Sequence, residues 1–469
     1  MSEKKIAGAR YVLPASAVVF LLCIAQFLDG MDVSSMGVVL PVIQRELGMG
    51  AQSLQWIVSG YVLGYGGFLL LGGRVADLFG RRRVFLISML VFGLASLAGG
   101  LATEGWMLIA ARIVKGICAG FTGPAALSLL LGLFQDPAKR NAALGTFSSV
   151  GALGFALGQV IGGFLGDISW RFTMLLPVPV AFVVVILGML TLTRDAKTQG
   201  AKQFDLVGAV TGTLALLSIV FGATQAATFG WISAAALIPL GIGLALFIAF
   251  LAYEKRAKTP LMPLEIFRRP GLGYASALGL FIVGNYIAFQ FIAVLYMQIV
   301  LHWSAFQSSL AFVFGGLIVV FAATRFARLA LRIGAVPLIV AGFLAELSGF
   351  SWFLLLDNIP SVLLVVVMQI LIGTGFAMAY PAINIQGLSG AHQDEHGLAS
   401  GIILSSFQVG GGIILAIVAS VFAASSPEGL IRYQNGLIAV VTSALLAISI
   451  AAYGWQRIRK GRLSMKHFG

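Results

Sequence analysis

Five ionisable side chains lie far inside long apolar stretches of the sequence, namely Asp29, Asp32, Arg112, Lys115 and Glu346. A charge at the centre of a lipid bilayer costs about 2.5 to 3.5 kcal/mol on insertion scales, so such residues usually mark proton or ion pathways. Carboxylates and cations at this depth can bind and release protons or charged solutes. These five residues are therefore the first candidates for a functional site.

Two of these stretches each carry a pair of like charges three positions apart. Residues at this spacing share one face of a helix, so Asp29 and Asp32 form one pair and Arg112 and Lys115 form another. By residue count, the two pairs lie at similar depth. Burial favours the protonated carboxylate and a nearby cation favours the charged form, whereas arginine stays protonated throughout. A cavity that opens and closes would therefore change how tightly the carboxylates hold protons.

From this arrangement we predict that Asp32 binds a proton or a cationic substrate, that Arg112 is its partner, and that Asp29 and Lys115 modulate the pair. The alternative is an ion-pair cluster that only orients two helices. Glu346 has no obvious partner nearby in the sequence. It is either a second site for a proton or cation, or a neutral side chain on a polar seam between helices.

The elements that must position these residues are membrane spans. Hydrophobic residues make up 59% of the 469 residues and charged residues 10%, whereas soluble proteins contain about 25% charged residues. A span needs about 20 apolar residues, which predicts an all-α membrane protein with fourteen transmembrane helices. The predicted spans are 14–41, 52–72, 84–102, 106–133, 142–165, 172–193, 206–226, 233–253, 273–300, 306–324, 335–356, 361–386, 398–424 and 434–456.

The distribution of basic residues predicts the orientation of these spans. Lys and Arg accumulate in cytoplasmic loops, and a cytoplasmic start leaves only Arg45, Arg171 and Arg432 in outer loops. Both termini are then cytoplasmic, in a cell membrane that we expect to be the bacterial inner membrane. The formal net charge of +13 follows from this topology, so we expect the lipid bilayer and not nucleic acid as the partner of the basic residues.

A faint internal repeat divides the chain. Arg112, Gly116 and Pro124 in the fourth span recur at the same offset as Gln369, Gly373 and Pro381 in the twelfth. Parallel repeats of this kind are typical of transporters, whose substrate sites lie between the halves near the bilayer midplane. The predicted organisation is a six-helix half at 1–198, an inserted helix pair with its flanks at 199–258, and a second six-helix half with a cytoplasmic tail at 259–469.

The motif Gly73-x-x-x-Asp77-x-x-Gly80-Arg81-Arg82-Arg83 resembles the signature of the major facilitator superfamily between its second and third spans. The fourteen-span count, and the segments FDLVGA and PLMPLEIFRR around the inserted pair, resemble the drug:proton antiporter branch of that family. The resemblance implies that Gly73, Asp77, Gly80, Arg81 and Arg82 form a conformational latch. LDGMDVSSMGVVLP resembles the first-helix motif and assigns the role of its acidic residue to Asp32.

The sequence departs from that branch at two motifs. The fourth span has Lys115 where the family usually has glutamine, and the fifth has Gly158-Gln159-Val-Ile-Gly162-Gly163 without the usual proline. The glycines Gly158, Gly162 and Gly163 suit close helix packing. The missing proline weakens the analogy to antiport and leaves the fold expectation intact.

Polar and aromatic side chains could line a cavity between the halves. The candidates are Trp56, Tyr61, Asn285, Tyr286, Gln290, Tyr296, Gln298, Tyr380, Asn384 and Gln408. The loop sequence HQDEH contains His392 and His396, but it has the composition of a solvated loop, and we expect no metal site there.

The function expected from these features is proton-coupled export of small amphipathic or cationic compounds by a monomer that alternates access. The alternatives are a narrow-substrate exporter or a proton symport importer on the same fold, and, from other classes, a membrane-embedded enzyme or a sensor. With four histidines and no phosphate-binding Gly-rich loop, we expect no enzymatic activity and no cofactor. Transport would be driven by the proton gradient.

Overall fold

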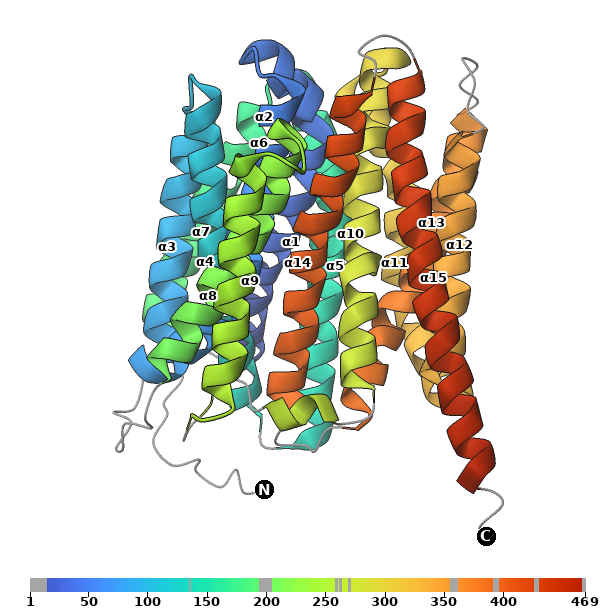
Figure 1. The fold of residues 1–469 in the computed structure, drawn as a ribbon. Helices are drawn as coiled ribbons and strands as arrows, with labels where there is room; N and C mark the ends of the chain where they lie inside the picture. The colour runs from blue at the N-terminus through green and yellow to red at the C-terminus, as the bar shows by residue number, and fades with distance from the viewer. Residues whose placement is uncertain are drawn as a thin grey trace.

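The computed structural model describes residues 15–134, 136–193, 205–257, 260, 264–268, 271–354, 362–390, 396–425 and 430–465. Within these residues all regular structure is helical (Figure 1). The helices are α1 (Ala15–Glu46), α2 (Ala51–Phe79), α3 (Arg81–Gly100), α4 (Gly105–Gly132), α5 (Pro137–Ile168), α6 (Arg171–Leu175), α7 (Pro177–Thr191), α8 (Leu206–Phe229), α9 (Ala234–Glu254), η1 (Leu264–Arg268), α10 (Leu272–Leu295), η2 (Tyr296–Val300), α11 (Ala305–Ile333), α12 (Ala335–Leu354), α13 (Val362–Leu388), α14 (His396–Ala424) and α15 (Ile431–Met465).

These helices confirm the predicted fold class. In the described part of the chain, thirteen helical segments are long and apolar enough to cross a membrane, and α2 is a bent pair, Ser53–Leu69 and Leu71–Phe79, that brings the number to fourteen. The short α6 and α7 together make the sixth span, with Pro177 at the first turn of α7. A proline fits there because the first turn of a helix needs no donor from it. Each predicted span therefore corresponds to one helix or one helix pair.

Two helices extend well beyond the spans predicted from hydropathy. The tenth span was predicted to end at residue 324, but α11 continues past Arg325 and Arg328 to Ile333. Similarly, α15 continues through the basic tail to Met465. Basic residues end an apolar run without ending a helix, because lysine and arginine are good helix formers. The end of α11 comes instead at Gly334, which has a φ of 98°. Glycine adopts this backbone conformation far more readily than other residues.

The helices pack into two groups that meet along two main contacts, with smaller ones from α1 to α10 and α11. In the first group α1 packs on α5 and α2 on α4, and in the second α10 packs on α14 and α11 and α12 on α13. The groups meet where α2 contacts α14 and where α5 contacts α11, and α8 packs on both α2 and α14. The boundaries predicted at residues 198 and 258 fall at or within segments outside the described residues, so they stay predictions.

The glycines predicted to pack helices lie at these contacts. A Cβ on Gly158 would lie 2.6 Å from the Met31 Cα and one on Gly162 2.6 Å from the Ser35 Cα, both on α1. A Cβ on Gly163 would lie 2.7 Å from the Ala305 carbonyl oxygen at the start of α11. One face of α5 thus lies against its own half and an adjacent face against the other half, at distances that only glycine allows.

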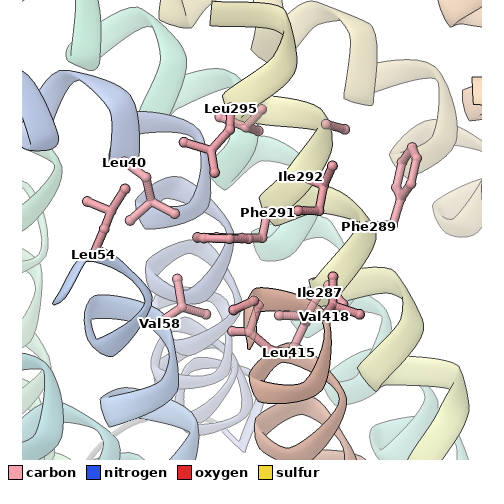
Figure 2. Packing of buried hydrophobic residues seen from close by; sticks show 14 of the residues in the cluster. Leu40, Leu54, Val58, Ile287, Phe289, Phe291, Ile292, Leu295, Leu415 and Val418 are labelled. Carbon is pink, nitrogen blue, oxygen red and sulfur yellow. The ribbon is translucent and has the colours of Figure 1, made fainter. Parts of the chain in front are cut away.

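The buried apolar side chains form three clusters, and their positions show that the bundle is closed at one end. One cluster joins both halves near the end of α1. In Figure 2, Leu40, Leu54 and Val58 of the first half face α10 and α14 of the second, where Phe291, Leu295 and Leu415 lie nearest to them, while Phe289 points to the other side of α10. At the opposite end, where α1 begins and α15 ends, each half has its own cluster. The halves are therefore sealed by one shared cluster at the end away from the termini, whereas at the other end they have two clusters, the second of which also packs against Leu71 of α2.

Candidate functional site

Asp32 of α1 is fully buried and bridges two cations of α4. Its Oδ2 accepts from Nη1 of Arg112 and its Oδ1 from Nζ of Lys115. All three side chains are at most 1% exposed. A charge pair with such burial is stable only when every remaining donor also finds a partner.

Other residues of the first half provide acceptors for further donors of Arg112 and Lys115. Arg112 Nε donates to the Ile57 carbonyl oxygen at 2.9 Å, and its guanidinium carbon lies 4.4 Å from the centroid of the Tyr61 ring. Lys115 Nζ donates to Ser96 Oγ at 2.8 Å, which in turn donates to the Met174 carbonyl oxygen. The cluster thereby joins α1 to α2, α3, α4 and α6, so a change at the Asp32 carboxylate acts on the packing of five helices.

Asp29 lies three residues earlier on the same helix but in a different environment. Its carboxylate accepts a hydrogen bond from the Tyr61 hydroxyl and also hydrogen-bonds to Tyr65, and the residue is partly exposed. Tyr65 in turn lies close enough to interact electrostatically with Tyr380 of the second half. Asp29 therefore belongs to the side of the cluster that faces the other half, whereas Asp32 is sealed inside the first.

The structure brings four of the five charged candidates together, with one change from the predicted pairing. Lys115 was predicted to modulate an Asp32–Arg112 pair, but it contacts Asp32 directly, so one carboxylate is shared by two cations. Asp29 makes its contacts with tyrosine hydroxyls. The spacing of three residues placed the two acids on one side of α1; the neighbouring helices assigned them different partners.

Glu346 of α12 lies apart from this cluster, in the second half. It is fully buried, and neither carboxylate oxygen has a hydrogen-bond partner among the described residues. Its side chain packs on Gly375 of α13, where a Cβ would lie 2.8 Å from the Glu346 Cγ. A charged carboxylate without a partner is strongly disfavoured in such surroundings, so this geometry suits a neutral, protonated acid.

Two buried glutamines, one on α5 and one on α13, were not among the site residues predicted from the sequence. Gln159 of α5, noted only for replacing a proline, donates from Nε2 to the Tyr286 hydroxyl of α10 at 3.2 Å, across the two halves. Gln369 of α13 takes the place in the second half that Arg112 has in the first, and its Oε1 has no partner among the described residues. The available signal was a polar side chain within an apolar run, the same signal that selected the charged residues.

The cavity candidates divide by position. Tyr286 contacts the rings of Phe155 and Phe376 and so lies between the halves, and Tyr380 stacks on Phe376 at 5.2 Å. Gln290 lies 3.1 Å from a Cβ built on Gly37 of α1. Tyr286 and Gln290 of α10 therefore face the first half, and Tyr380 of α13 lies beside Phe376, which also contacts Tyr286.

Other cavity candidates lie elsewhere. Trp56 packs on Phe221 of the inserted helix α8 at 5.6 Å, and Asn285 accepts from Ser443 of α15 at 2.7 Å, so these contacts are with α8 and α15 and not with the opposite half. The sequence could not show this because the rotation of each helix depends on its neighbours. Asn384 donates to the Tyr380 carbonyl oxygen of its own helix at 2.9 Å. Gln298 of η2, by contrast, donates to the Val38 carbonyl oxygen of α1 at 2.7 Å and so joins the two halves.

Tyr296 and Gln408 complete the list of candidates. Tyr296 packs on Phe353 and Tyr433, within the second half. Gln408 lies on the contact between α2 and α14, 3.0 Å from a Cβ built on Gly66. His392 lies outside the described residues, as does the side chain of His396, and the described part of the chain contains no group of three metal-ligating residues.

The latch motif forms the turn between α2 and α3. Gly80 has a φ of 100°, which suits glycine, and ends α2. Asp77 accepts from Arg81 at 2.8 Å, and Arg82 donates to the Met189 carbonyl oxygen of α7 at 2.8 Å. A Cβ on Gly73 would lie 3.7 Å from Pro124 of α4. The turn is therefore tied to α4 and α7 of its own half.

We expect Asp77→Asn to slow transport while changing the free energy of unfolding by less than about 1 kcal/mol, because exposed ion pairs contribute little to stability. Asp77 and Arg81 are 48% and 45% exposed. The measurements are the melting temperature in detergent and the initial rate of substrate efflux. Glu104→Gln, at an exposed carboxylate outside the latch, is the control. Equal transport rates for the two variants would show that Asp77 is not part of a latch.

The fold and the site together define a class of protein. Two packed groups of membrane-spanning helices, joined at one end, with charged side chains buried inside the spans, fit the architecture of a secondary transporter. The structure resembles a POT family transporter in complex with a thioalcohol-conjugated peptide, with a TM-score of 0.70 at 16% identity over 94% of this chain and 96% of that one. It also resembles the inward-open xylose transporter XylE from E. coli, with a TM-score of 0.61 at 14% identity over 92% and 95%.

Sequence comparison gives the family directly. Residues 22–416 match the family model of the Major Facilitator Superfamily, and the chain belongs to that superfamily. It is 34% identical over 444 residues to the cephamycin export protein CmcT of Amycolatopsis lactamdurans, covering 93% of this chain and 91% of that protein. It is 35% identical over 434 residues to the puromycin resistance protein pur8 of Streptomyces alboniger, covering 91% and 86%. The family prediction is thereby confirmed.

Proposed function

We propose that this chain exports small amphipathic or cationic compounds, antibiotics among them, in exchange for protons. The observation that carries the coupling is the Asp32 carboxylate, sealed between Arg112 and Lys115 at the junction of five helices. The names of the relatives, a cephamycin exporter and a puromycin resistance protein, support the substrate class and the direction. No cofactor is needed, since the entry of one proton releases about 2.3 kcal/mol per 100 mV of membrane potential.

Protonation of Asp32 would change the packing of the first half. A neutral carboxyl group gives up its attraction to both cations, so α1 and α4 lose the contact that holds them at this depth. Deprotonation restores that attraction. This provides two arrangements of the same helices whose balance depends on a bound proton, which is what alternating access requires.

The neighbouring Asp29 provides a second carboxylate, placed to meet a substrate. It is partly exposed and hydrogen-bonds to Tyr61 and Tyr65, with Tyr380 of the second half nearby. Aromatic faces and a carboxylate together attract organic cations. We assign the substrate's charged end to this group, the proton to Asp32, and to Glu346 a second protonation site in the other half.

The same proposal gives the orientation and working form of the protein. With both termini in the cytoplasm of a bacterial cell, the sealed end of the bundle is extracellular and the arrangement described above faces inward. The protein would act as a monomer, because the charged cluster is built from one chain.

The test is ethidium efflux from cells expressing the protein, measured with and without a protonophore. Wild type is compared with Asp29→Asn, Asp32→Asn and Glu346→Gln. Efflux that the protonophore abolishes and Asp32→Asn eliminates supports the proposal. Efflux no faster than in control cells would exclude ethidium export, and proton-driven uptake or export of one compound class would then be tested on the same variants.

A further inference from the structure

A cavity of about 560 Å³ lies outside the charged cluster, between α10, α14 and α15. Its walls include Phe281 of α10, Ile414, Ile417 and Val418 of α14, and Ile438 and Ala439 of α15. Ile417 and Ile438 are 39% and 49% exposed. In a helix that spans a bilayer, an exposed apolar side chain faces lipid, so this cavity is a groove open to the membrane.

The polar side chains in the groove wall direct their hydrogen bonds into the protein. Asn435 donates to Ser425 Oγ at 3.0 Å, Thr442 to the Ile438 carbonyl oxygen at 2.8 Å, and Ser443 to Asn285 Oδ1 at 2.7 Å. The wall therefore presents an apolar surface to an occupant. A hydrocarbon chain fits such a wall, whereas a polar solute would lose its hydration there without replacement.

The length of the groove matches one leaflet. From Asn435 to Leu446, which both line it, α15 rises about 17 Å, close to half of a hydrocarbon core of about 30 Å. An acyl chain that enters from the membrane surface would therefore reach roughly the midplane. The groove starts near the end of α14 and the start of α15, so the leaflet concerned is the one on the sealed side of the bundle.

A cation stands at the mouth of the groove. Arg432 lies three residues before Asn435 on the same face of α15, and its guanidinium carbon lies 3.9 Å from the centroid of the Phe422 ring, next to the last part of the groove on α14. In the described part of the chain it pairs with no carboxylate, and its Nε has no hydrogen-bond partner. By contrast, Arg171 pairs with Glu46.

We propose that this groove binds one phospholipid, with an acyl chain between α14 and α15 and the phosphate on Arg432. Guanidinium groups bind phosphate through paired charge-assisted hydrogen bonds, and the stack on Phe422 holds the group at the mouth. The lipid would fill the space between α10, α14 and α15, so its occupancy would affect how these three helices pack.

Native mass spectrometry of the full chain in detergent, titrated separately with phosphatidylglycerol and with a diacylglycerol of the same chains, tests the proposal. We expect wild type to hold one phosphatidylglycerol molecule more tightly than the rest. Ala439→Phe fills the groove and should abolish that site. Ala245→Phe, at an exposed position of α9, adds the same bulk to another surface and should leave it intact.

Arg432→Gln distinguishes the contribution of the lipid headgroup to binding from that of the acyl chain. It should weaken phosphatidylglycerol binding about fivefold, the effect of one basic residue at a membrane surface, and leave diacylglycerol binding unchanged. Arg45→Gln, at an exposed arginine in the last turn of α1, is its control and should change neither. If Ala439→Phe does not fold, this comparison alone decides. Equal phosphatidylglycerol retention by Arg432→Gln and Arg45→Gln, or by Ala439→Phe and Ala245→Phe, would mean surrounding lipid only and overturn the proposal.

Discussion

Asp32→Asn is expected to abolish proton-driven efflux and to lower the free energy of unfolding by about 3 to 5 kcal/mol, the cost of leaving a buried charge without its partner. The physical reason is that this one carboxylate pairs with both Arg112 and Lys115, and all three side chains are at most 1% exposed. The stability change is measured as a shift of the thermal unfolding midpoint in detergent. Transport is measured in vesicles with an imposed pH gradient.

A matched control for this variant is Asp167→Asn. Asp167 accepts hydrogen bonds from the backbone nitrogens of Ala305 and Phe306 at the start of α11. Asparagine keeps one acceptor oxygen for the 2.8 Å bond from Ala305 and loses the 3.3 Å bond from Phe306. This change should therefore cost about 1 kcal/mol, the contribution of one hydrogen bond. It removes a carboxylate outside the charged cluster, and efflux should continue.

The double variant Asp32→Asn with Lys115→Gln distinguishes a coupling role from a structural one. It removes one cation together with the carboxylate, so most of the lost stability should return. Transport should remain absent if Asp32 carries the proton. Recovery of proton-driven transport in the double variant would show that the cluster only orients helices, and proton coupling would have to be sought at Asp29 or Glu346.

Gly116→Ala is expected to have the second largest effect, a loss of about 1 to 3 kcal/mol or more, as for overpacking at a rigid contact. A Cβ at this position of α4 would overlap the Tyr61 carbonyl oxygen and lie 2.9 Å from the Tyr61 Cα of α2. Backbone atoms cannot rotate away, so the two helices must separate. Arg112 lies one turn earlier on α4, so efflux should fall as well.

Gly241→Ala is the control for this substitution. Gly241 lies within α9 and has no atom within 4 Å of a built Cβ. Alanine there should be neutral or stabilise the helix by about 0.5 to 1 kcal/mol. The measurement is again the unfolding midpoint in detergent. If Gly116→Ala has the same unfolding midpoint as Gly241→Ala and transports like wild type, then α2 and α4 are not held in the close contact described.

The sequence alone determined the architecture and the family, because both can be recognised from apolar runs and short motifs of residues close together in the chain. Apolar runs of about 20 residues predicted the spans, and each corresponds to a helix or helix pair. The motif from Gly73 to Arg83 and the first-helix motif around Asp32 indicated the superfamily, which the family match confirms. Charge within an apolar run selected Asp29, Asp32, Arg112, Lys115 and Glu346 without any knowledge of their contacts.

Only the tertiary structure decided the partners of these side chains. Helical spacing placed Asp29 and Asp32 on one side of α1, but the packing of α2 and α4 gives the first tyrosine hydroxyls and the second both cations. It also turns Asn285 toward α15 and joins Gln159 to Tyr286 across the halves. Hydropathy and spacing depend on residues close in sequence, whereas the rotation and depth of a helix are set by contacts with segments far along the chain.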